Sequence, residues 1–257
     1  MRVEPYIINP DDPRAPPQEV WDRLTPEERD RIVRCLPSEL PVTEWATPEG
    51  TPHFVAKVRM SDALGGFFSR LGRKVFLACE LPVYYPGESM FAPDLLAVMD
   101  VETHDRNGWV VSHEGRGLDL ALEVYVAGEW RKDVERNLER YARLGIREYF
   151  VFDRGRLRLQ GWRLAEGQRL AYQPILPQQG FYTSQVLGLE LQLEGERLRF
   201  YYSGAPVPES HEMIATLQRL VAEAEAHRAD EAQRREEVER RLAEALAELE
   251  RLRGSKG

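Results

Sequence analysis

Residues 209–253 form a stretch without glycine or proline, bounded by Pro208 and Gly254. The stretch is rich in Ala, Glu, Arg and Leu, residues that favour helix over other backbone conformations. Pro208 and Gly254 are residues that commonly bound a helix. The sequence therefore predicts one long helix over 209–253.

The long helix carries a seven-residue register that is apolar at both ends and polar at its centre, where Glu231 and Arg234 interrupt it. The register positions are Leu217, Ala224, Glu231, Val238, Ala245 and Leu252. Two interpretations remain open. The helix is either a solvated rod stabilised by Glu/Arg pairs or a coiled coil through which the protein self-associates as a dimer.

Composition divides the chain into three parts: 1–45, 46–205 and 206–257. The first part is rich in proline and has one helix signal, in which Thr25 is the N-cap, Pro26 the first helical residue and Glu28 the third residue after the cap. The second part has the pattern of an α/β domain. The third is the helical tail.

The α/β part alternates helical and strand-like periodicity. Residues 51–72 are predicted to be a helix with Phe54, Val58, Leu64, Phe67, Phe68 and Leu71 facing inward. Gly145 is the natural end of a second helix that starts near residue 129. Strand-like runs cover 74–85, 94–101, 109–114, 118–126, 148–153, 156–164 and 189–202. The predicted fold is a mixed sheet flanked by helices.

Bulk properties exclude several classes of protein. The two cysteines cannot form a disulfide framework, and the formal net charge of −8 argues against a broad basic surface for nucleic acid. The N-terminal residues lack the apolar stretch of a signal peptide, and no uncharged run approaches the length of a membrane span. We therefore expect a cytoplasmic protein with no membrane partner. The sequence contains no Walker loop, GxGxxG, HExxH or GxSxG motif.

Two carboxylates stand on strand-like runs. Asp94 follows Pro93 at the start of one run, and Glu123 shares a strand face with the small residue Ala121. A carboxylate on a core strand costs desolvation free energy unless it has a partner. Two carboxylates that converge at one sheet edge would form an oxygen-rich site for Mg²⁺ or Mn²⁺. The alternative is that each is a half-exposed residue at a strand end.

Other polar residues have weaker signals. Glu80 would add a third carboxylate if its strand neighbours that of Asp94, although a solvent-facing position is the simpler interpretation. His53, His104 and His113 share no metal-ligand spacing, so we expect surface or loop histidines.

The order of these features resembles the PD-(D/E)xK nuclease superfamily and, more closely, the Uma-type restriction endonuclease family. The resemblance covers about residues 50–205. Its markers are "PVYYPG" before "PDLLAV", then "LALEV", then Asp133, then "ERYARLGIREYFVFD". It implies a restriction-endonuclease-like fold, Asp94 and Glu123 as metal ligands, and a supporting role near Asp133.

The chain departs from the family pattern at the lysine. Tyr125 occupies the third position of Glu-x-Lys, and Asn137 stands where the family commonly has a lysine in the following helix. Lys132 is the nearest lysine after Glu123 and is the candidate catalytic residue that would position the attacking water. The alternative is a surface lysine in a polar helical turn.

These features predict an enzyme, a Mg²⁺- or Mn²⁺-dependent endonuclease that hydrolyses DNA phosphodiesters, with Asp94, Glu123 and Lys132 as its site. The main alternative is a nuclease-derived module that binds nucleic acid or assembles through the coiled coil without efficient cleavage. A third candidate, an enzyme acting on RNA or small phosphoesters, would use the same site.

Overall fold

The computed structural model describes residues 6–39, 50–126, 130–165 and 171–254, with the side chains of 130–133 and 252–254 outside the description. The chain divides into two compact units, Met1–Pro208 and Glu209–Gly257. Within the described residues, no helix combines the length and apolar character needed to cross a membrane.

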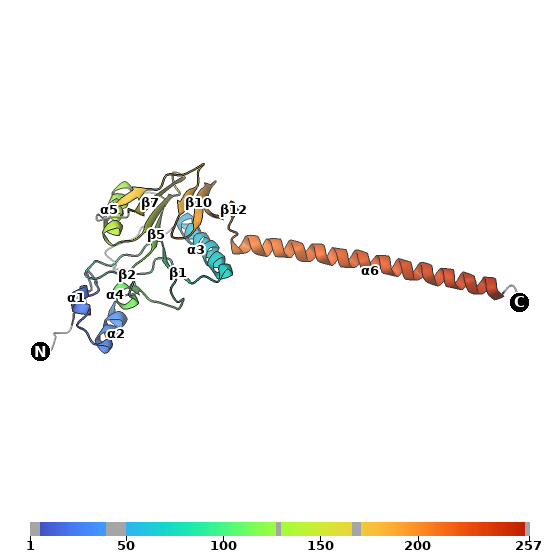
Figure 1. Ribbon diagram of the computed structural model, residues 1–257, viewed down its shortest axis with the longest axis horizontal. Helices are drawn as coiled ribbons and strands as arrows, with labels where there is room; N and C mark the ends of the chain where they lie inside the picture. The colour runs from blue at the N-terminus through green and yellow to red at the C-terminus, as the bar shows by residue number, and fades with distance from the viewer. Residues whose placement is uncertain (1–5, 40–49, 127–129, 166–170, 255–257) are drawn as a thin grey trace. The chain divides into compact units, whose positions relative to one another are not determined.

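A six-stranded sheet forms the centre of the first unit (Figure 1). Its order is β1 (Val75–Ala78), β3 (Leu95–Met99), β5 (Leu120–Tyr125), β6 (Glu148–Asp153), β7 (Arg158–Leu164) and β8 (Tyr172–Pro174). Strands β5 and β6 are parallel, and the other neighbours are antiparallel. The sheet is therefore mixed, as the sequence predicts.

Alternating residues of the central strands enter two separate cores. Leu120, Leu122 and Val124 of β5 pack with helix α3 (Thr51–Leu71). Ala121 packs on the opposite face with helix α5 (Trp130–Arg143). Helices α3 and α5 thus cover opposite faces of the sheet (Figure 1).

A second sheet completes the core beside α3. Its order is β12 (Ala205–Pro206), β11 (Arg197–Tyr202), β10 (Leu189–Glu194) and β9 (Tyr182–Ser184). Leu191 and Phe200 of this sheet belong to the same buried cluster as Leu64 of α3. Helix α3 therefore lies in a core shared by both sheets, which fixes its position along the central strands.

The N-terminal helices α1 (Gln18–Trp21) and α2 (Pro26–Cys35) pack on a two-stranded sheet of β2 (Val83–Tyr84) and β4 (Trp109–Val110). The predicted capping box of α2 is present: Thr25 accepts from the Glu28 amide, and Glu28 accepts from the Thr25 amide. The prediction of one strand over 109–114 is wrong after Val110, because residues Val111–Glu114 form the short helix α4.

Helix α3 forms where expected, but its predicted inward face is partly wrong. Phe54, Val58 and Leu71 are exposed, whereas Met60 and Lys57 are buried. Only 3% of the Lys57 surface is exposed to solvent. The helix is rotated so that this lysine faces inward, because its ammonium group has an acidic partner there.

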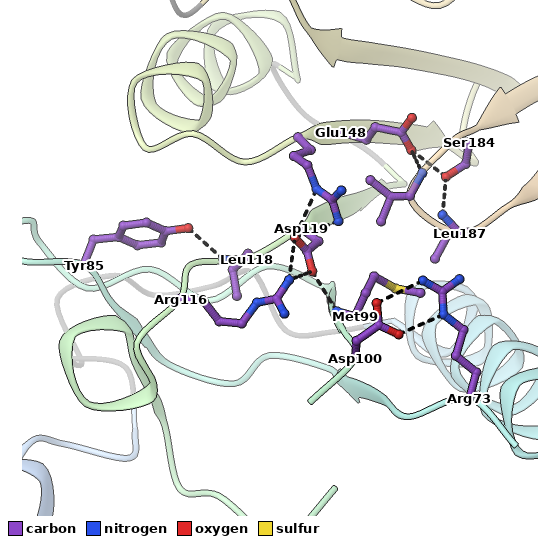
Figure 2. A network of polar contacts seen from close by, with 12 residues as sticks. Arg73, Tyr85, Met99, Asp100, Arg116, Leu118, Asp119, Glu148, Ser184 and Leu187 are labelled. Carbon is purple, nitrogen blue, oxygen red and sulfur yellow. Dashed lines mark hydrogen bonds and ion pairs between the residues drawn. The ribbon is translucent and has the colours of Figure 1, made fainter. Parts of the chain in front are cut away.

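One edge of the central sheet is fixed by buried acidic residues with arginine partners (Figure 2). Asp119 accepts from the Met99 amide at 2.7 Å and pairs with Arg116 and Arg147 at 3.0 and 2.9 Å. Glu148, fully buried, pairs with Arg163 and accepts a hydrogen bond from Ser184, which joins the two sheets. The carboxylates at this edge have a structural role.

The second unit is helix α6 (Ser210–Gly254), which matches the predicted long helix. Its apolar side chains are exposed, among them Leu217 and Val238 at 58% and 64%. Intrahelical ion pairs run along it, such as Arg241 with Glu237 at 2.5 Å. The coiled-coil and dimer predictions stay predictions.

Candidate metal centre

Asp94 and Glu123 meet at the edge of the central sheet opposite to Asp119. Antiparallel β3 and β5 pair Leu95 with Leu122, so the residues one step further, Asp94 and Glu123, come together. The Asp94 amide donates to Glu123 Oε2 at 3.3 Å, and Asp94 Oδ2 accepts from the Val124 amide at 2.7 Å. The structure thus brings together the two carboxylates that the sequence singles out.

Glu123 lies among apolar groups and beside another acid. Burial, followed by the negative charge of Asp94, raises the pKa of Glu123 to about 8. Its Oε1 accepts from the Tyr141 hydroxyl of α5 at 2.8 Å. A carboxyl group held partly protonated near neutral pH would become fully ionised beside a cation.

Helix α3 and the segment after β1 bring further potential metal ligands close to Asp94. His53 Nε2 lies 3.1 Å from Asp94 Oδ2, and the Glu80 amide donates to the Pro93 carbonyl at 3.0 Å. One potential ligand atom from each of His53, Glu80 and Asp94 lies within 4.8 Å of the others. This group is a candidate metal cluster of oxygen and imidazole donors, with Glu123 hydrogen-bonded to its Asp94 member.

Lys57 stands next to this cluster. It lies one helical turn after His53 on α3, so both side chains lie on the same side of the helix. Its Nζ is 2.5 Å from Glu80 Oε1, and 4% of its side chain is exposed against 50% for Glu80. A buried ammonium group is thereby held beside the carboxylates, the arrangement in which a lysine stabilises negative charge on a bound phosphate.

The sequence-based site is therefore only partly described. Lys132 belongs to the first turn of α5, but its side chain and that of Asp133 lie outside the described residues, so the Lys132 prediction stays a prediction. Glu80 is half-exposed, yet it lies beside Asp94, which is the arrangement that would make it a third carboxylate.

His53 was not expected at the site, and neither was Lys57. The expectation of a surface or loop position for His53 is wrong, because the residue is on α3 with its ring against Asp94. The spacing of four between His53 and Lys57 on a predicted helix was the one available sequence signal. It carries little weight without knowledge of which helical face is buried.

Comparison with known proteins identifies the family of this chain. The model of the Uma2 family, described as "Putative restriction endonuclease", matches residues 42–194. The chain belongs to this family. The matched range contains β1, β3, β5, α3 and α5, and therefore every residue of the candidate metal centre.

One solved structure similar to this Uma2-family chain is a putative nuclease belonging to DUF820 from Anabaena variabilis. The two share 12% sequence identity with a TM-score of 0.43, over 55% of this chain and 76% of the other. No protein with curated annotation matches the chain.

Proposed function

We propose that this Uma2-family protein is a divalent-cation-dependent nuclease that hydrolyses phosphodiester bonds in DNA. The observation that carries the proposal is the meeting of Asp94 and Glu123, together with His53, Glu80 and the buried Lys57, at one sheet edge. The family supplies the reaction class, and the local geometry supplies candidate roles.

The donor set fits a hard or borderline divalent cation. Asp94 and Glu80 offer carboxylate oxygens, which Mg²⁺ and Mn²⁺ prefer, and His53 offers one imidazole nitrogen. Glu123 accepts from the Asp94 amide and offers a further carboxylate beside this group. We assign Asp94 and Glu123 as the principal ligands, with Glu80 and His53 beside them. A bound cation would supply Lewis acidity toward the phosphate and lower the pKa of a bound water.

The remaining catalytic roles would fall to side chains and amides of the protein. Lys57, held by Glu80, would neutralise charge that develops on the phosphate and orient the attacking water, the role that the sequence suggests for Lys132. Lys57 is favoured because its ammonium group donates to Glu80, a member of the candidate metal cluster. The Val124 amide would hold the Asp94 carboxylate in place.

Arginines near the end of β5 that carries Glu123 favour a polyanionic substrate. Arg59 of α3, Arg154 and Arg197 line a cavity of about 220 Å³. Arg154 follows β6, and its amide donates to the Tyr125 carbonyl, two residues beyond Glu123. Glu196 pairs with Arg154 at 3.0 Å and offsets part of this charge. Contacts of this type bind nucleic-acid phosphates irrespective of sequence.

Plasmid cleavage in Mg²⁺ or Mn²⁺ tests the proposal. Asp94→Asn and Glu123→Gln should each lower nicking by about 100-fold or more. Asp100→Asn is the matched control, because Asp100 follows the far end of β3 and pairs with Arg73 at the surface. Nicking that survives both site substitutions would show that the site is wrong. An RNA of the same length in parallel separates the two substrates.

We also propose that the protein self-associates through α6, whose apolar residues are exposed along its length. This surface favours the alternative function as well, an assembly module without cleavage. The two are separated by calorimetry: absence of Mn²⁺ binding by a protein that still dimerises would favour the module.

A further inference from the structure

The apolar side chains of α6 recur mainly at two positions of a seven-residue repeat. One position holds Ile214, Val221, Arg228, Arg235, Leu242 and Leu249, and the other holds Leu217, Ala224, Glu231, Val238 and Ala245. The large apolar members are all at least 54% exposed. Spacings of three and four along this seam are those of a coiled coil. We call these eleven residues the α6 seam.

We propose that two copies of α6 pair in antiparallel orientation, in the register that places Glu231 of one copy opposite the partner's Arg235. The inference rests on the self-association proposed above and adds the partner, the direction and the register. Its first support is the charge at the centre of the seam, where Arg228, Glu231 and Arg235 interrupt the apolar positions.

A parallel, in-register pair would place each of these residues against itself. Arg228, Glu231 and Arg235 would then give three like-charge contacts in the centre of the interface, which is unfavourable. In the antiparallel pair, residues of the first position face residues of the second. Glu231 then meets the partner's Arg235, and symmetry makes the same contact twice.

The apolar positions agree with the same register. Leu217 faces the partner's Leu249, and Ala224 faces the partner's Leu242. Val221 likewise faces the partner's Ala245, so each alanine lies against a larger side chain. A parallel pair would set alanine on alanine at both levels and leave gaps.

Arg228 is the remaining polar position, and it faces the partner's Val238. Its aliphatic stem can cover the valine while the guanidinium group reaches solvent. A shift of one heptad would also pair Arg228 with Glu231 across the interface. That shift, however, sets Arg235 against Ala224 and moves Leu249 beyond the apolar part of the seam. The proposed register therefore buries more apolar surface.

Charge reversal on the full-length protein tests the direction by sedimentation equilibrium. Glu231→Arg alone and Arg235→Glu alone should each weaken dimerisation on the order of tenfold or more, because each dimer loses two pairs. The double variant should restore it. Glu236→Arg and Arg240→Glu are the control, with the same spacing on the outer face of the helix. In a parallel dimer, residues 231 and 235 each face themselves. The wild type, both single variants and the double variant would therefore all oppose like charges and should dimerise equally well.

Cross-linking provides an independent measurement in a Cys35→Ser/Cys79→Ser background. A mixture of Leu217→Cys and Leu249→Cys chains should form disulfide-linked dimers on oxidation, and neither variant alone should do so. Cross-linking of each variant with itself would overturn the antiparallel arrangement. A wild-type protein that sediments as a monomer would refute the proposed self-association. Dimers that are insensitive to the charge reversals would refute only the orientation, and plasmid cleavage is independent of both.

Discussion

Lys57 Nζ lies 2.5 Å from Glu80 Oε1, although the two residues are 23 positions apart and belong to different segments of the chain. The lysine comes from the buried side of α3, and the glutamate follows β1. Their pairing places an ammonium group beside the candidate metal cluster of His53, Glu80 and Asp94. In the proposed function, a substrate phosphate bound at this sheet edge would lie near the Lys57 ammonium group.

Replacement of Lys57 separates the two candidate lysines. Lys57→Met keeps most of the aliphatic volume and removes the charge, so we expect plasmid nicking to fall by about 100-fold or more. Lys132→Met should stay near the wild-type rate. Calorimetry should show that Lys57→Met still binds Mn²⁺, because Asp94 and Glu123 remain. If Lys132→Met is inactive and Lys57→Met is active, the catalytic lysine is Lys132 of α5 and not Lys57.

The stability of the metal-free protein should fall as pH rises. The pKa of Glu123 in the folded state is raised from 4.5 to about 8. The unfolded chain therefore loses its proton first, and the folded state is progressively disfavoured between these two values. In urea unfolding with chelator present, Glu123→Gln should flatten this dependence and be more stable than wild type at mildly alkaline pH. Equal slopes for the two proteins would contradict the raised pKa.

The two acids at the opposite sheet edge should differ in their effect on stability. Asp119 is buried and accepts from the Met99 amide and two arginines, so Asp119→Asn should cost about 3 kcal/mol of unfolding free energy. Asp100 pairs with Arg73 at the surface, and Asp100→Asn should cost less than about 1 kcal/mol. Urea midpoints measure both. Similar costs would show that the Asp119 network (Figure 2) is not a structural centre.

Two glycines give opposite predictions for alanine substitution. A Cβ at Gly161 would lie 2.5 Å from the Phe150 ring on the neighbouring strand, so Gly161→Ala should destabilise the protein by about 2 kcal/mol. A Cβ at Gly65 would meet nothing within 4 Å inside α3. Gly65→Ala should therefore stabilise the protein by about 1 kcal/mol. Thermal unfolding distinguishes these signs, and a stabilising Gly161→Ala would contradict the packing of β6 against β7.

The parts of the fold that local signals determine were predictable from sequence. The capping box of α2, the length of α6 and the alternation of β5 all depend on near neighbours in the chain. The convergence of Asp94 with Glu123 could also be expected, because each residue belongs to a strand-like run of the same α/β part of the chain. The mixed sheet and the family resemblance are confirmed.

The remaining site residues depend on contacts between distant parts of the chain. Hydrophobic periodicity placed Phe54 and Val58 inward on α3, and this left Lys57 outside. The real face is set by packing between two sheets and by the ion pair with Glu80, neither of which leaves a periodic signal. Glu80 itself reaches Asp94 through the pairing of β1 with β3 and a left-handed turn at φ 53°.

The inward rotation of α3 has a consequence for finding such a site from sequence. If the charge is delivered by α3, the chemistry does not require a lysine at position 125, where Tyr125 packs against the core beside α5. A search that requires a lysine two residues after the strand glutamate would therefore overlook a site arranged in this way. A search for a cation one turn after a histidine on the preceding helix would find it.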